Sequence, residues 1–198
     1  MDKYIIVALY GKSGAGKDSI QRLLTQRHPG LHSIVSMTTR PIREGEKDGV
    51  DYHFTDIVEF TKKVLSGDML EATCFRDWFY GTPIESLDIN KVNIGVFNLA
   101  GIEALKQDPR VAVYPAFVDA PDKIRLLRSL NREENPDCAE ICRRFATDEH
   151  DFANIDFKPH YVIPNQESTN LAEIVDNLFD LLMQEFSASG QIWENLYK

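Results

Sequence analysis

An uninterrupted apolar run leads directly into a glycine-rich loop near the start of the chain, and this pair limits the possible folds more than any other feature. The run covers residues 5–9 (IIVAL), and because no polar residue interrupts it, it predicts a buried parallel β-strand. The loop covers residues 11–17 (GKSGAGK), and an amphipathic helix with Ile20, Leu23 and Leu24 on one face follows it. Strand, loop and helix in this order are the context of a phosphate-binding P-loop.

The loop has the chemistry that a nucleoside triphosphate requires. Its glycines let backbone N–H groups turn inward, the helix N-terminus adds partial positive charge, and Lys17 can reach the terminal phosphates. A chance cluster of glycine and lysine in a turn is the alternative, which the flanking strand and helix disfavour. Asp18 stands where the motif has Ser or Thr to hold magnesium. The predicted triphosphate-binding residues are Gly11, Lys12, Ser13, Gly14, Ala15, Gly16, Lys17, Asp18 and Ser19.

Length and charge limit the class of protein. A chain of 198 residues suits one domain, or a core domain with small insertions, and no apolar run approaches the roughly 20 residues that span a bilayer. The N-terminus lacks a basic region and runs straight into the first strand, so we expect no signal peptide. Three cysteines are too few and too unevenly placed for a disulfide framework, which favours a reduced, cytoplasmic protein. A net charge of −9 argues against a nucleic-acid duplex as partner but allows a single nucleotide in a locally basic cleft.

A polar segment follows the second expected strand, residues 31–36. It reads SMTTRPIREGEKDGVDYHF from Ser36 to Phe54, and a solvated basic turn would account for its arginines if they stood alone. The whole segment, however, resembles the monophosphate-binding segment of guanylate kinases. The positions that carry this resemblance are Ser36, Thr38, Thr39, Arg40, Arg43, Gly45, Glu46, Gly49, Tyr52 and Phe54.

The resemblance implies a small insertion, residues 37–90, that binds GMP. Arg40, Arg43 and Tyr52 would contact the acceptor phosphate, and Ser36 would lie near the base. Further along, FYGT (79–82) is similar to the family's Tyr-Gly-Thr/Ser. The resemblance implies that Glu71 and Thr82 bind guanine and that Tyr80 binds the phosphate. As alternatives, Glu71 could be a surface strand residue and Tyr80 an ordinary core residue. One carboxylate can accept from both N1–H and N2–H₂ of guanine, so the assignment is chemically sound.

The buried strand expected at residues 92–98 departs from the family. Guanylate kinases usually carry Asp-x-Asp at its end, where this chain has Val96-Phe97-Asn98. The family's carboxylates assist with the base and the metal, so base selectivity and metal geometry are both open here. Asp18 is a second departure, because it replaces the Ser or Thr of the P-loop motif. The hypothesis is that Asp18 supplies the negative charge missing at residues 96–98 and holds Mg²⁺. In the alternative, Asp18 faces solvent and Ser19 or water lies near the metal.

A third basic cluster resembles the arginines of the family's lid, residues 128–148. Arg128, Arg132 and Arg144 match the positions that reach the transferring phosphates. Arginines on amphipathic helices usually face solvent, and the alignment needs one extra residue before Arg144, so Arg143 competes for the last role. The polar stretch from Asn131 to Asp137 suits a mobile lid.

The C-terminal part continues the alternation. We expect the last strand at residues 161–163. Asn165, which follows it, matches an asparagine that lies near the adenine of ATP in guanylate kinases. Residues 170–186 predict a strongly amphipathic helix. The tail with Trp193 and Tyr197 is expected to dock on the core.

Alternating strands and helices predict an α/β fold of the P-loop NTPase type, a mainly parallel sheet wrapped by helices. The core would be residues 1–36 and 91–198, with the monophosphate-binding insertion between them and a helical lid. The resemblance implies ATP-dependent phosphoryl transfer to GMP or dGMP with Mg²⁺, by a cytoplasmic kinase with no nucleic-acid, membrane or obligate protein partner. Its catalytic residues would be Lys17, Arg40, Arg128, Arg132 and Arg144.

Two alternatives stay open at this point. The missing Asp-x-Asp allows a kinase for another nucleoside monophosphate, which Glu71 and Thr82 disfavour. Some guanylate-kinase-like domains bind phosphorylated protein segments without catalysis, and the intact loop with Lys17 and the lid arginines argues against that.

Overall fold

The computed structural model describes residues 3–43, 45–75, 77–132, 134–153, 155, 157–167 and 169–188. The expected docking of Trp193 and Tyr197 lies outside these residues. Within them, no helix has both the length and the apolar composition to cross a bilayer.

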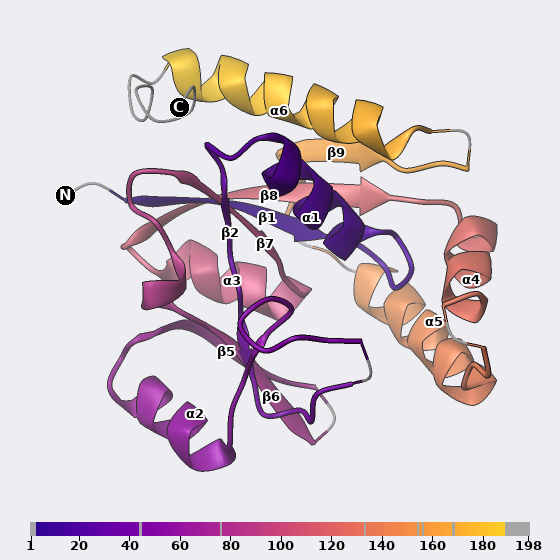
Figure 1. Ribbon diagram of the computed structural model, residues 1–198, viewed down its shortest axis with the longest axis horizontal. Coiled ribbons are helices and arrows are strands. Elements are labelled where there is room, and N and C mark those ends of the chain that lie inside the picture. Colours follow the sequence, from indigo (N-terminus) through magenta and orange to yellow (C-terminus); the bar gives the residue numbers. More distant parts are fainter. Residues whose placement is uncertain are drawn as a thin grey trace.

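The core is a parallel five-stranded sheet in the order β2-β7-β1-β8-β9 (Figure 1). The apolar run forms the central strand, buried by neighbours on both sides, as its lack of polar residues requires. The strands are β1 (Tyr4–Tyr10), β2 (His32–Ser33), β7 (Val92–Val96), β8 (Val111–Asp119) and β9 (Tyr161–Pro164). The predicted α/β class with a mainly parallel sheet is therefore confirmed.

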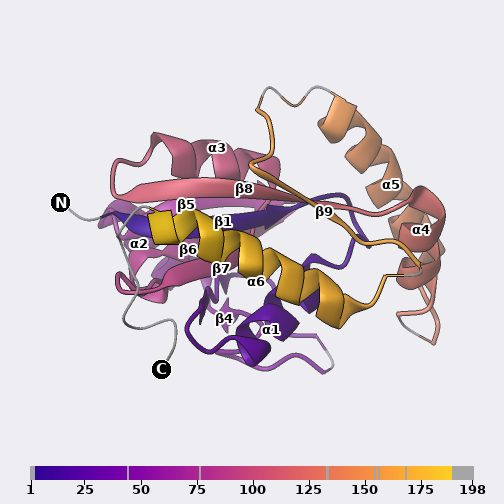
Figure 2. The same ribbon diagram turned by 90° about the horizontal axis from the view of Figure 1, so that it is seen from above.

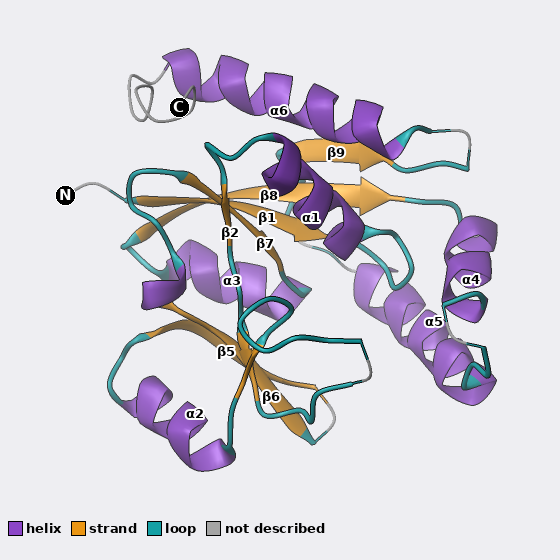
Figure 3. Cartoon of the chain, in the orientation of Figure 1, coloured by secondary structure: helices purple, strands orange, loops and turns teal. Residues whose placement is uncertain are grey.

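Helices cover both faces of this sheet (Figures 2 and 3). Alternate residues of β1 point to opposite faces: Val7 packs with α1 and α6, and Ile6 packs on the side of α3. The helices are α1 (Lys17–Arg27), α3 (Leu99–Gln107), α4 (Asp122–Leu130), α5 (Cys138–Ala153) and α6 (Leu171–Ala188).

A second, mixed sheet in the order β4-β3-β6-β5 lies within residues 37–90. Its strands are β3 (Met37–Thr38), β4 (His53–Phe54), β5 (Met69–Phe75) and β6 (Trp78–Pro83), with α2 (Ile57–Leu65) packed against it and the short 3₁₀ helix η1 (Ile84–Ser86) after it. The Asp56 side chain caps α2 by accepting from the N–H of Glu59 at 2.8 Å. The division into a core and a separately acting insertion stays a prediction.

Contacts at both ends of β5 join the second sheet to the core. Strand β5 packs against α3, and Asn98 Nδ2, at the start of α3, donates to Thr73 Oγ1 of β5 at 3.1 Å. At the other end of β5, Arg110 donates to the carbonyl oxygens of Gly67 and Met69. These bonds fix β5, and the residues it carries, relative to the core sheet.

Candidate active site

The P-loop connects β1 to α1 and needs glycine at two positions. Gly14 and Gly16 have φ angles of 77° and 95°, in the left-handed region that side chains disfavour. The space is also taken: a Cβ on Gly14 would lie 2.5 Å from the carbonyl oxygen of Arg125, and one on Gly16 would lie 2.5 Å from Asn165 Nδ2. The loop is therefore packed closely between α4 and the segment after β9.

The side chain of Lys17 folds back onto the backbone of this loop. Its Nζ donates to the carbonyl oxygens of Gly11 at 2.8 Å and Lys12 at 3.3 Å. Burial lowers the pKa of Lys17, and the nearby carboxylates of Asp18 and Asp148 oppose that effect. A cation held this way by two neutral oxygens is available to a phosphate, which is the role predicted for it.

The three residues predicted for the guanine base lie together. Ser36 Oγ is 3.1 Å from Thr82 Oγ1, and the Thr82 hydroxyl donates to Glu71 Oε1 at 2.8 Å. Only 8% of Glu71 is exposed, and burial raises its pKa to about 7, with the Thr82 hydrogen bond opposing the shift. The second carboxylate oxygen of Glu71 faces Gly101, where a Cβ would lie only 3.3 Å away.

Asn98 holds the place of a family carboxylate and makes structural contacts. Its Oδ1 accepts from the N–H of Gly101 at 2.7 Å and caps α3, while its Nδ2 donates to Thr73. Val96, the other departure, packs against the core cluster that includes Val7. Neither Val96 nor Asn98 carries a charge, so Glu71 is the carboxylate among the three residues predicted for the base.

The residues predicted for the acceptor phosphate form a cationic and aromatic group. Arg40 is buried, pairs with Glu46 at 2.8 Å and lies 5.5 Å from the ring centre of Tyr52. Tyr52 packs edge-on against Tyr80 at 6.0 Å. Burial lowers the pKa of Arg43, and the charges of Arg40 and Arg144 lower it further. Positive charge is therefore concentrated beside the two tyrosines.

This group lies next to the start of α1. Burial raises the pKa of Tyr52 to about 12, and the negative charge of Asp18 contributes to that shift. Asp18 is exposed at the first turn of α1. Asp18 is therefore at the P-loop end of α1, and its charge acts on Tyr52 of the predicted monophosphate site.

The lid arginines differ in their surroundings. Arg128 reaches the P-loop, where it donates to Ala15 O at 3.4 Å and to Asn165 Oδ1 at 3.1 Å. Arg143 and Arg144 both pair with Glu140, at 2.8 and 2.7 Å, and Arg132 is exposed. Asn165 is buried and also donates to Ala15 O at 2.7 Å, so both ends of its amide contact protein.

Sequence reasoning missed three residues that contact the P-loop: Arg125, Asp148 and Glu149. Asp148 Oδ2 accepts from the N–H of Ser13 at 2.7 Å, and Glu149 pairs with Lys12. The helical pattern of α4 and α5 predicts polar faces without saying which polar residue is buried. No sequence signal separates these three from ordinary surface charges.

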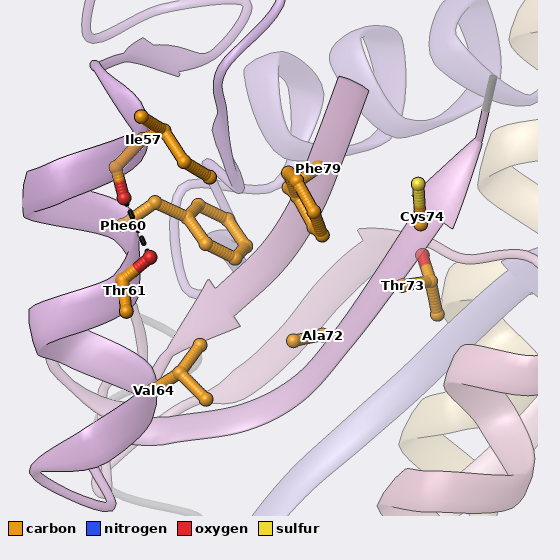
Figure 4. A pocket seen from close by; sticks show the side chains of 8 residues that line it. All are labelled: Ile57, Phe60, Thr61, Val64, Ala72, Thr73, Cys74 and Phe79. Carbon is orange, nitrogen blue, oxygen red and sulfur yellow. Dashed lines mark hydrogen bonds between the residues drawn. The ribbon is translucent and has the colours of Figure 1, made fainter. Parts of the chain in front are cut away.

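An apolar groove lies apart from these residues, between α2 and the β5–β6 hairpin (Figure 4). Ile57, Phe60 and Val64 point into it from α2. Glu71 and Thr82 are not among its lining residues, so the groove is separate from the predicted base site.

The parallel sheet, its strand order and the glycine loop between β1 and α1 define an α/β protein of the P-loop NTPase type. A family model described as guanylate kinase matches residues 2–185. A guanylate kinase from Gloeobacter violaceus is 34% identical over 185 residues, covering 91% of this chain and 87% of that protein. One from Frankia casuarinae is 43% identical over 143 residues, covering 70% and 77%. The chain belongs to the guanylate kinase family, a family of enzymes.

A solved structure shares the fold. The crystal structure of guanylate kinase from Anaplasma phagocytophilum superposes with a TM-score of 0.67 at 23% identity, covering 99% of this chain and 90% of that one.

A substitution of Asn165 can distinguish a structural role at the P-loop from a contact with the adenine of ATP. Because both ends of its amide are bonded to protein, Asn165→Ala should lower the free energy of unfolding by about 1–3 kcal/mol. The preference for ATP over GTP, measured as a ratio of kcat/KM, should stay the same. The exposed neighbour Gln166→Ala is the control. A reduced ATP preference with unchanged stability would instead assign Asn165 to adenine.

Proposed function

We propose that this protein transfers the γ-phosphoryl group of ATP to GMP or dGMP, giving ADP and GDP or dGDP. The observation that carries the proposal is the Ser36–Thr82–Glu71 chain, a buried carboxylate with two hydroxyls, on the sheet beside the P-loop. The family membership of the chain supports it. These substrates are cytoplasmic metabolites, and we propose that compartment for the enzyme.

Guanine suits this carboxylate because it presents two adjacent donors. The ionised Glu71 would accept from N1–H and N2–H₂, and the hydroxyls of Thr82 and Ser36 would assist. Adenine lacks this donor pair, which favours GMP over AMP. Residues 37–90 would hold the monophosphate as a unit, with its phosphate on Arg40, Arg43, Tyr52 and Tyr80.

The reaction needs position and charge rather than a covalent intermediate. An oxygen of the acceptor phosphate attacks the γ-phosphorus, the bond to the β–γ bridging oxygen breaks, and ADP leaves with that electron pair. Lys17 would hold the terminal phosphates. Arg40, Arg128, Arg132 and Arg144 would spread positive charge over the transferring group as residues 128–148 close and exclude water.

Magnesium is expected with ATP, and its oxygen preference can be compared with the residues present. No cluster of three His, Cys, Asp or Glu occurs among the described residues, but Mg²⁺ at phosphates needs only one or two carboxylates besides water and phosphate oxygens. Asp18 at the start of α1 fits that requirement. The ion, when bound, would neutralise phosphate charge.

Simple electrostatics supports this role for Asp18. A carboxylate in the first turn of a helix is favourable by about 0.3–1 kcal/mol. Beside a triphosphate, two charges about 4 Å apart repel by roughly 4 kcal/mol at an effective dielectric constant of 20. The repulsion between Asp18 and the triphosphate therefore outweighs the favourable interaction with the helix dipole, unless a cation such as Mg²⁺ lies between the two negative groups.

The function is tested by ADP release from ATP across ribo- and deoxyribonucleoside monophosphates. GMP and dGMP should have the highest kcat/KM. Highest activity with AMP or a pyrimidine would overturn the guanine assignment, and no turnover with any monophosphate would indicate a binding module.

The pKa of Glu71 predicts a pH dependence for GMP. Guanine needs the ionised carboxylate, so kcat/KM should fall about tenfold per pH unit below pH 7. The GMP phosphate also titrates, near pH 6. Glu71→Gln separates the two: it should lower kcat/KM by roughly ten- to a hundredfold and remove the pH 7 component while keeping the one near 6. An unchanged profile in Glu71→Gln would contradict the assignment.

Asp18 can be tested by magnesium titration. Asp18→Asn keeps the shape and removes the charge, so the Mg²⁺ concentration for half-maximal activity should rise several-fold, with little change in the free energy of unfolding. Asp180→Asn, an exposed residue of α6, is the control. Superimposable titrations of Asp18→Asn and wild type would exclude a metal contact and leave Ser19 or water in that place.

A further inference from the structure

Two acidic residues of α5 contact the P-loop. Asp148 Oδ2 accepts from the backbone N–H of Ser13 at 2.7 Å, and its Oδ1 is 3.4 Å from the Ser13 hydroxyl. Glu149 pairs with Lys12. Two consecutive loop residues are thereby bonded to a helix about 135 positions later in the chain.

A buried arginine holds Asp148 from the other side. Arg125 is 1% exposed and donates to Asp148 Oδ2 at 3.3 Å, to Ser13 O at 3.1 Å and to Asp122 Oδ1 at 2.6 Å. Its guanidinium lies 4.4 Å from the ring centre of Phe145 on α5. A buried guanidinium is tolerated only with such partners, so Asp148 is fixed between the loop and this cation.

Helical geometry connects this anchor to the lid arginines. Arg144 precedes Asp148 by four residues, so the two share one face of α5. Burial is the main cause of the lowered pKa of Lys17, and the charge of Arg144 adds to it, as it does for Arg43. Arg144 therefore lies on the face of α5 that carries Asp148, the residue bonded to the P-loop. Arg143 lies one position round the helix, and 42% of its side chain is exposed.

We propose that Asp148 and Arg125 are positioning residues for phosphoryl transfer. They attach the C-terminal half of α5 to the P-loop, so that Arg144, rather than Arg143, faces the transferring group when residues 128–148 close. The inference rests on the proposed function. It differs from a purely structural brace because the anchor acts on the rate through Arg144.

The first test is Asp148→Asn, which keeps an oxygen for Ser13 but removes the charge that pairs with Arg125. The kcat for GMP should fall by roughly ten- to a hundredfold, the loss expected from misplacing a catalytic group. The KM for GMP should stay within about twofold, since no GMP contact changes. Asp151→Asn, an exposed carboxylate on the same helix, should leave kcat unchanged.

A double-mutant cycle identifies the route. If Asp148 acts through Arg144, Asp148→Asn combined with Arg144→Ala should be no slower than Arg144→Ala alone. Multiplied losses would overturn the proposal. A wild-type kcat in Asp148→Asn would also overturn it. This holds if the variant only melts at a lower temperature, and it holds if the variant only binds ATP more tightly because a competing carboxylate is gone.

A second variant covers failure of the first to fold. Arg125→Met with Asp148→Leu removes both charges together and leaves neither unpaired in the interior. This variant should fold and still lose kcat, and a wild-type kcat in it would overturn the proposal. Wild-type protein that phosphorylates no monophosphate would overturn the proposed function itself, and this inference with it.

Discussion

The backbone of the P-loop is the constraint on which the rest of the site depends. At Gly14 and Gly16 the chain adopts left-handed angles, and the missing Cβ atoms let Arg125 O and Asn165 Nδ2 approach the loop. Helices α4 and α5 and the segment after β9 are consequently bonded to one short loop. The buried strand β1 fixes where that loop begins, so the sheet, the loop and the helices α4 and α5 form one connected unit.

Charge in the site is balanced locally in a chain that is acidic as a whole. Arg40 pairs with Glu46, Arg144 with Glu140 and Arg125 with Asp148. Like charges this close would repel without such partners. A phosphate binds a guanidinium in the same two-oxygen geometry as a carboxylate, so under the proposed function nucleotide would replace the partners of Arg40 and Arg144, while the buried Arg125 pair would remain.

Hydrogen bonds from Asn98 and Arg110 of the core to β5 hold the predicted base site in place. Asn98 caps α3 and reaches Thr73, and Arg110 holds the carbonyl oxygens of Gly67 and Met69. Strand β5 therefore keeps Glu71 against Gly101, where water is excluded and the carboxyl pKa rises to about 7. Asn98, which departs from the family pattern, therefore connects α3 to β5.

The sequence by itself determined the α/β class, the P-loop and the places of α2 and α6, because apolar periodicity, glycine spacing and capping residues act over a few neighbouring positions. The resemblance to guanylate kinases also predicted that Glu71 and Thr82 would bind the same base, and the structure joins them by a hydrogen bond. Only the tertiary structure decided that Arg125 is buried and that Asp148 reaches Ser13, 135 positions away. Burial and pairing of a charge depend on which distant segments pack around it, and no local pattern records that packing.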